Sequence, residues 1–181
     1  MKKIIVLSVL VLLACQLFSQ SKYKAGDVVV GKNVKYICKR GIGVTPYVRI
    51  DNSNNRDTTL NRYYNDGTLV DEFEETAASY RFGRSDLYSV VKLIFTKEEL
   101  KLLKDNRVTL TIYFTTNNKG ITTELSFGFL RDAIVLSTFD PDRFYELEKK
   151  FKPILILSID ESHQNIRNFN WVYDVDFEDV L

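Results

Sequence analysis

Residues 108–129, VTLTIYFTTNNKGITTELSFGF, decide the fold. The first half places an apolar side chain at every second position: Val108, Leu110, Ile112 and Phe114. A period of two is typical of a strand with one buried face. The sequence Asn-Asn-Lys-Gly at 117–120 suits a tight turn, because glycine tolerates a positive φ angle. The returning segment places five residues on one side: Ile121, Thr123, Leu125, Phe127 and Phe129. We therefore predict an antiparallel hairpin with an apolar inner face and a threonine-rich outer face.

Segments on both sides of the hairpin predict helices. The sequence Thr-Lys-Glu-Glu at 96–99 is a capping box, in which the threonine hydroxyl and the glutamate carboxylate each bind a free backbone amide. That helix is expected to end near Asp105. Asp140 and Pro141 begin a second helix, since aspartate caps the end and proline needs no hydrogen-bond partner in the first turn. Its apolar residues recur at helical spacing: Phe144, Leu147 and Phe151.

The remaining segments predict strands around this unit. Residues 87–95, 154–159 and 169–177 are each expected to form one strand, and residues 28–38 form two short strands or one bent strand. Pro46 predicts that residues 44–50 lie at a sheet edge. Residues 21–26 are a polar lead-in that could serve as a tether. We expect residues 21–181 to form a single α+β domain, a largely antiparallel twisted sheet with two short helices on one face.

Residues 1–20 have the layout of a secretory signal peptide. Lys2 and Lys3 precede an uncharged apolar run of 11 residues at 4–14. A helix that crosses a membrane needs roughly 20 such residues, and no later segment is long and apolar enough. We therefore expect an exported protein with no transmembrane segment in the mature chain, which argues against ATP-driven chemistry and genome binding.

Two processing routes are open for this leader. The sequence Leu-Leu-Ala-Cys at 12–15 resembles a bacterial lipobox, in which Cys15 is acylated and becomes the new N-terminus. A diacyl group would provide a lipid anchor, because two chains hold a protein stably at a membrane. Alternatively, cleavage after Ser19 or Gln20 removes Cys15. The expected location is the cell envelope, either anchored in the outer membrane or in the periplasm.

Charge and cysteine content exclude further classes. Removing Lys2 and Lys3 leaves 23 basic residues against 24 acidic ones, so the mature chain has no electrostatic footprint for nucleic acid. Cys15 is acylated or lost, which leaves Cys38 as a lone thiol. Its apolar neighbours predict a buried thiol rather than a nucleophile or an intermolecular bridge. A chain of this length needs no disulfide or metal to fold.

Acidic residues form three patterns that could carry chemistry. One resembles the alternate ligands of a calcium loop: Asp51, Ser53, Asn55 and Asp57. Arg56 and Arg62 stand where that loop requires glycine and a bidentate glutamate, so a solvated turn is expected. A second pattern could hold the acid and base of a glycoside hydrolase but is expected to be a solvated loop: Asp71, Glu72, Glu74 and Glu75. The third is expected on the wet face of the last strand: Asp174, Asp176, Glu178 and Asp179.

His163 is the only histidine, and it lies in a polar segment where an exposed side chain is expected. The sequence has no nucleophile elbow, zinc pattern, phosphate loop or dinucleotide fingerprint. Six aromatic residues could stack on sugars or peptides, although core packing or cross-strand pairing is expected for most: Tyr63, Tyr64, Tyr80, Phe82, Tyr88 and Tyr113. Phe144, Phe151 and Trp171 are assigned to the core. We assign no catalytic residue, metal ligand or cofactor.

The order strand, Asn-Lys-Gly turn, strand, Asp-Pro helix, strand resembles small exported proteins of unknown function from gut Bacteroidota. The resemblance rests on residues 108–120, 140–152 and 154–158. The same ββαβ order, at about 87–160, is similar to the C-terminal domain of TonB-type energy transducers. The usual transducer has a membrane anchor and a Pro-rich spacer, and this chain has neither. The resemblance implies a module shape and supplies no catalytic residues.

These observations favour a non-catalytic cell-envelope protein that binds an unidentified envelope protein or ligand, for example through a sheet edge. Two alternatives stay open. One is a small hydrolase that uses the acidic residues, and the other is a structural or assembly lipoprotein. No nucleic-acid partner is expected.

Overall fold

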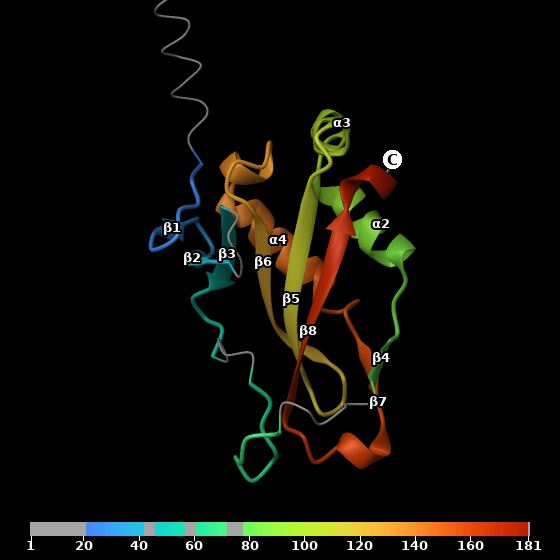
Figure 1. Ribbon diagram of the computed structural model, residues 1–181. Coiled ribbons are helices and arrows are strands. Elements are labelled where there is room, and N and C mark those ends of the chain that lie inside the picture. Colours follow the sequence, from blue (N-terminus) through green and yellow to red (C-terminus); the bar gives the residue numbers. More distant parts are fainter. Residues whose placement is uncertain (1–20, 42–45, 57–60, 72–77, 181) are drawn as a thin grey trace, which may run out of the picture.

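The computed structural model describes residues 21–41, 46–56, 61–71 and 78–180. Six antiparallel strands form the main sheet in the order β1-β2-β3-β6-β5-β8 (Figure 1). They are β1 (Val28–Val30), β2 (Lys35–Arg40), β3 (Tyr47–Asn52), β6 (Thr122–Leu130), β5 (Thr109–Asn117) and β8 (Asn168–Asp176). A second sheet pairs β4 (Ala78–Tyr80) with β7 (Leu157–Ile159).

In the described part of the chain, the α-helices are α2 (Arg84–Ile94), α3 (Lys97–Asp105) and α4 (Pro141–Phe151). Short 3₁₀ turns lie at η1 (Leu136–Thr138), η2 (Glu161–His163) and η3 (Phe177–Asp179). The predicted α+β class with a largely antiparallel sheet is therefore confirmed.

The central hairpin forms with the predicted pairing and with Leu125, Phe127 and Phe129 buried, but Ile121 and Thr123, which were expected on the same face, are exposed. Ile112 of β5 pairs with Phe127 of β6, and both side chains are fully buried. Gly120 adopts a φ of 75° in the turn, and a Cβ there would lie 2.0 Å from the Leu157 carbonyl oxygen. Glycine is therefore required at this position both for its backbone angle and for space. The pairing shifts at Thr115 and Thr116, where the hairpin carries a bulge.

The two predicted helix starts are also confirmed. The Thr96 hydroxyl accepts from the Glu99 amide at 3.2 Å, and the Thr96 amide donates to the Glu99 carboxylate at 2.8 Å. The Asp140 carboxylate accepts from the Asp142 amide at 2.8 Å, with Pro141 in the first turn. Each cap satisfies amides that have no partner within the helix.

Residues 87–95 do not form the predicted strand, because they belong to α2 and its C-cap. Leu87, Val90, Val91 and Phe95 are buried, whereas the intervening Ser89 and Lys92 are exposed. That spacing is helical, and it allows α2 to bury one stripe against the core. The described residues therefore contain three α-helices rather than the two predicted.

The prediction of an edge strand at residues 44–50 is wrong as well. β3 lies inside the sheet between β2 and β6. Pro46 directly precedes β3, where its missing N–H interrupts no pairing, and its carbonyl accepts from the Arg131 amide at 2.7 Å. Of the predicted ββαβ portion, β5, β6 and α4 occur in the expected order, but β7 pairs with β4 outside the main sheet.

The apolar core lies between the main sheet and the helices. Its centre is the Phe144 ring of α4, which contacts Tyr23 edge-on at 5.5 Å and stacks on Phe129 at 5.5 Å. Tyr23 is fully buried, and its hydroxyl donates to the Phe139 carbonyl at 2.7 Å. Residues 21–26 are therefore not a free tether, because a core residue fixes them to the domain.

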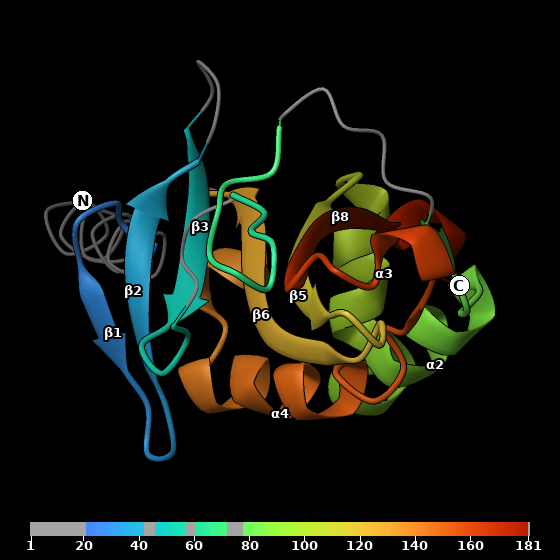
Figure 2. The same ribbon diagram turned by 90° about the horizontal axis from the view of Figure 1, so that it is seen from below.

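Figure 2 shows the two sides of the curved sheet, with α4 against one face and the chain that follows β3 on the other. Among the described residues, no helix has the length and hydropathy required to cross a membrane. The face without α4 is the one that remains accessible, and we call it the open face.

Candidate functional site

The open face is polar because every second side chain of its strands points away from the core. In the sheet register, Arg49 of β3 is paired with Gly128 of β6, and Tyr113 of β5 with Ser126 of β6. The residues that the central strands place on this face are Tyr47, Arg49, Asp51, Tyr113, Ser126 and Gly128. The chain after β3 crosses this face in two described pieces, residues 53–56 and 61–71, which we call the strap (Figure 2). The Asn55 side chain donates to the Leu125 carbonyl at 2.9 Å, and the side chains of Asn168 and Asn170 donate to the Asn61 carbonyl.

A buried carboxylate lies at the centre of the open face. Asp51 is 1% exposed and forms ion pairs with Lys39 at 2.6 Å and Arg49 at 2.7 Å. Burial alone would raise the pKa of Asp51, but hydrogen bonds from Lys39 and Ser126 and the Arg49 charge outweigh it, so the pKa lies below its ordinary value. The carboxylate is thus kept ionised, which suits an ion-pair role and not that of a general acid.

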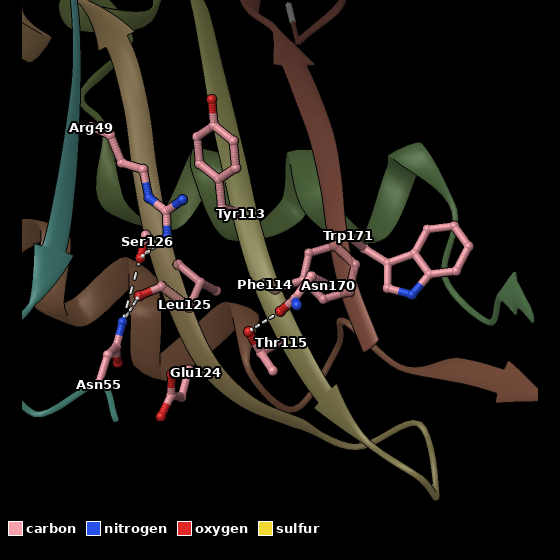
Figure 3. A pocket seen from close by; sticks show the side chains of 10 residues that line it. All are labelled: Arg49, Asn55, Tyr113, Phe114, Thr115, Glu124, Leu125, Ser126, Asn170 and Trp171. Atoms are coloured by element: carbon pink, nitrogen blue, oxygen red, sulfur yellow. Dashed lines mark hydrogen bonds between the residues drawn. The ribbon is translucent and has the colours of Figure 1, made fainter. Parts of the chain in front are cut away.

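Arg49 joins this ion pair to an aromatic wall. Its guanidinium lies 4.6 Å from the centre of the Tyr113 ring, within the range of a cation–π contact. Figure 3 shows the small polar pocket beside it, with Arg49, Asn55 and Ser126 on one side and the bonded pair Thr115–Asn170 on the other. The pocket holds only about 10 Å³, so it admits no group larger than a water molecule.

Tyr47 fills the space above two glycines. A Cβ on Gly41 would lie 2.0 Å from the Tyr47 ring, and one on Gly128 would lie 2.2 Å from its hydroxyl. The hydroxyl is buried beside those of Thr111 and Tyr113 without a well-aligned hydrogen bond to either. Burial raises the pKa of Tyr47 far above its ordinary value, so the phenol stays neutral.

A hollow of about 340 Å³ lies at the α3 end of the open face, and we call it the upper hollow. Its apolar lining comprises Tyr47, Val108, Leu130, Ala133 and Ile134. Leu130 and Ile134 are 47% and 38% exposed, which is high for aliphatic side chains that share one cavity. Its volume is within the range of small-molecule sites.

The loop that carries Ile134 is strained. Val135 adopts φ 69° and ψ −59°, and the Leu136 amide closes a γ-turn on the Ile134 carbonyl at 2.8 Å. A β-branched residue rarely adopts positive φ, and such a turn costs about 1–3 kcal/mol. The buried side chains of Ala133 and Leu136 hold the turn from both sides. Strain of this kind is concentrated at ligand sites, which marks the upper hollow as a candidate.

A second hollow of about 490 Å³, the lower hollow, lies at the hairpin end of the same face. The strap contributes Arg56 and Tyr63, the hairpin strands contribute Asn117 and Glu124, and the chain entering β8 contributes Arg167 and Asn168. Thr111 lines the upper hollow and Thr115 the lower one. Four residue steps along the strand separate them, which is about 13 Å.

Three threonines connect β5 to β8 along the open face. The hydroxyls of Thr109 and Thr111 donate to Asp176 and Asp174, each at 2.6 Å, and Thr115 donates to Asn170 at 2.7 Å. The C-terminal acidic residues are therefore partnered. Glu178 and Asp179 form ion pairs with Arg107 and Arg84 respectively. Asp174 and Asp176 are exposed on the last strand, in agreement with the prediction.

The calcium-like pattern does not assemble. Asp51 is committed to its ion pairs on β3, Asn55 binds the Leu125 carbonyl, and Asp57 lies outside the described residues. Across the described ranges, no three His, Cys, Asp or Glu side chains are grouped so as to hold a metal ion. Of the second acidic pattern, Asp71 is exposed, and Glu72, Glu74 and Glu75 also lie outside the described residues.

His163 lies in η2 and is half-buried rather than fully exposed. The Ser162 hydroxyl donates to Asp160 at 2.7 Å and lies 2.9 Å from His163 Nδ1. In a catalytic triad the aspartate would contact and orient the histidine. Here the Ser162 hydroxyl makes both contacts, one with Asp160 and one with His163, and the Asp160 carboxylate caps the turn. This arrangement is structural.

Cys38 is buried and free, and burial raises the pKa of its thiol to about 11. A thiol that stays protonated is a poor nucleophile, which agrees with the predicted packing role. Residues 1–20, including the predicted signal peptide and Cys15, lie outside the described residues.

Several of the candidate aromatics pack together beside β8. Tyr80 lies 5.0 Å from Phe82, 5.6 Å from Trp171 and 5.5 Å from Tyr173, measured between ring centres. Phe144 and Phe151 are fully buried as predicted, whereas Trp171 is half-buried at the rim of the core. Tyr63 and Tyr113 are different, because they line the lower hollow and the polar pocket.

Sequence reasoning missed Tyr47, Arg49, Arg56 and Arg167. The alternation of Arg49 and Asp51 on one predicted strand was a usable signal, since residues two apart share a face. The contribution of the two other arginines depends on the strap, whose path over the sheet no local pattern indicates.

The fold has a counterpart among solved structures. The crystal structure of a DUF5043 family protein from Bacteroides uniformis ATCC 8492, at 1.85 Å resolution, is similar with a TM-score of 0.69 and 18% identity, covering 87% of this chain and 88% of that chain. At this identity the likeness shows the fold, and it is consistent with the resemblance to uncharacterised Bacteroidota proteins. The sequence matches no family model and no curated protein.

Proposed function

We propose that this chain is an exported, non-catalytic binding protein of the cell envelope, which holds a ligand or a segment of another protein on the open face. The upper hollow carries the proposal, because exposed aliphatic side chains, a cavity of about 340 Å³ and a strained turn coincide there. An apolar group of the ligand occupies this hollow.

The open face supports this role better than the predicted sheet edge does. The outer strand β1 has only three residues, so it offers few backbone groups for an added strand. The other outer strand, β8, is partly covered, because the Tyr80 hydroxyl donates to the Val172 carbonyl at 3.3 Å. The predicted resemblance to TonB-type domains adds no support for energy coupling, because β7 pairs with β4 outside the main sheet.

Binding is tested by NMR shift mapping with indole as an apolar probe. We expect the largest shifts at the amides of Val108, Leu130 and Ile134. Ile134→Arg, a change at a partly exposed site, should abolish them by filling the hollow. Leu93→Arg is the matched control, because Leu93 is 72% exposed on α2. Shifts that survive Ile134→Arg, or that centre on Leu93, would contradict the proposal.

Export rests on the leader sequence and is tested separately by intact mass spectrometry of the protein from its native cells. We expect either a chain that begins at a diacylated Cys15 or one that begins near Gln20. A soluble chain that retains residues 1–20 would contradict export without affecting the binding result.

A further inference from the structure

The lower hollow is positively charged in a way that the rest of the open face is not. Arg49 at the centre is neutralised by Asp51 at 2.7 Å. In contrast, the guanidinium groups of Arg56 and Arg167 have no hydrogen bond or ion pair with any described residue. The carboxylate of Glu124 also lines the hollow and is partnered. The two guanidinium groups therefore lie beside a single carboxylate in this lining, that of Glu124, which already accepts a hydrogen bond from the Arg56 amide.

The backbone fixes both arginines even though their side chains are free. The Arg56 amide donates to the Glu124 carboxylate at 2.6 Å, and the Arg167 amide donates to the Tyr63 carbonyl at 2.7 Å. The Tyr63 amide in turn donates to the Asn168 side chain at 3.1 Å. The strap is thus hydrogen-bonded to β6 at Arg56 and to the chain entering β8 at Tyr63, so the backbone positions of both arginines are set before any ligand arrives.

The rest of the lining restricts the ligand class. Thr115, Thr123 and Asn117 supply hydroxyl and amide groups, and Tyr63 supplies a flat ring. No described lining residue is aliphatic, so the hollow offers no pocket for an apolar peptide side chain. Guanidinium groups bind carboxylate and sulfate through paired hydrogen bonds, and hydroxyls and amides bind sugar hydroxyls.

We propose that the lower hollow binds an acidic sugar, with the carboxylate between Arg56 and Arg167 and the sugar ring against Tyr63. This inference rests on the proposed binding role of the open face, and it names the ligand class of the second hollow. The volume of about 490 Å³ is within the range of ligand sites.

Isothermal titration of the full mature chain with a glucuronic acid disaccharide tests the proposal. We expect saturable binding that weakens with added salt, because the charges are exposed. Arg56→Gln and Arg167→Gln should each weaken it at least tenfold. Arg131→Gln is the matched control, since Arg131 is exposed just after the other end of β6. Circular dichroism verifies that each variant folds.

Three outcomes would overturn the proposal: equal binding of a neutral glucose disaccharide, an equal loss in Arg131→Gln, or preferred binding of a tripeptide through its C-terminal carboxylate. Ile134→Arg separates this inference from the proposed function. If glucuronate binds the native chain and Ile134→Arg equally while the native chain shows no indole site, only the role of the upper hollow is wrong. If indole binds and glucuronate does not, only the acidic-sugar assignment is wrong.

Discussion

Tyr47 occupies a space that exists only because two residues lack side chains. Its ring lies against Gly41, and its hydroxyl lies over Gly128 on the neighbouring strand. This arrangement fixes one wall of the upper hollow.

Gly128→Ala should destabilise the domain by about 1–3 kcal/mol, because the new methyl group overlaps the Tyr47 hydroxyl. Urea unfolding measures the change. The double variant Gly128→Ala/Tyr47→Ala should recover part of the loss, since it removes the overlap. If the double variant loses as much stability as the two single changes added together, or more, the overlap is not the cause.

Asp51 should make the free energy of unfolding depend on pH in the acidic range. Its pKa is lowered in the folded protein, so its contribution is present above the unfolded value near 4 and is lost as pH falls through the folded value. We expect the native chain to lose more stability than Asp51→Asn between about pH 5 and pH 2.

Asp51→Asn should also cost about 1–3 kcal/mol at pH 7, since Lys39 and Arg49 lose their anionic partner. Asp105→Asn is the control, because it removes an exposed carboxylate whose one ion pair among the described residues is with Lys101. Urea midpoints at several pH values measure both effects. Parallel pH curves for the native chain and Asp51→Asn would contradict the assigned role.

At the scale of elements, the local sequence was sufficient to predict the helix starts and the hairpin, because local interactions determine them. The capping box at Thr96, the Asp140 cap and the 108–129 alternation each depend on residues within a few positions of one another. The segment that forms α2 is rich in Val, Leu and Ile, a composition that also favours a strand. Leu87, Val90 and Val91 already showed the helical period. The position of β3 inside the sheet depends on distant pairing with β6, which no local pattern contains.

Arg143 connects the helices. Its guanidinium donates to both Glu99 oxygens at 2.7 Å, to the Ile94 carbonyl at 2.6 Å, and lies 4.1 Å from the centre of the Phe139 ring. These contacts join α4 to the junction between α2 and α3. The hydrogen bond from Arg143 holds the pKa of Glu99 below its ordinary value.

Arg143→Lys should cost about 1 kcal/mol, because lysine keeps the charge but cannot donate to both oxygens and the carbonyl at once. Lys149→Arg on the same helix is the control, since Lys149 is exposed and pairs only with Glu146 in the described structure. Chemical denaturation compares the two. Equal effects would show that the forked geometry contributes nothing.

At the scale of the molecule, residues 21–26 complete the core, and a chain beginning at residue 24 would lack the buried Tyr23 ring. Tyr23→Ala should therefore destabilise the domain by about 3–5 kcal/mol. Lys24→Ala, at an exposed neighbour, should have no such effect. Thermal unfolding distinguishes them, and a melting temperature unchanged by Tyr23→Ala would contradict this assignment.

The two hollows were beyond the reach of the sequence for the same physical reason. Each is assembled from segments more than fifty positions apart, such as Arg56 with Arg167 and Tyr47 with Ile134. Their side chains meet only after the sheet has paired and the strap has crossed it. The sequence did indicate the polar character of the open face, through the outward threonines of β5.

The burial of Tyr23 also sets a geometric limit on any membrane attachment. Eight residue steps separate Cys15 from this ring, and a fully extended chain covers at most about 29 Å over that distance. If Cys15 carries the acyl chains, the segment between Cys15 and Tyr23 is shorter than the bilayer, whose thickness is roughly 40–45 Å. The domain would then be held next to the lipid surface and could not diffuse freely through the periplasm to reach its ligand.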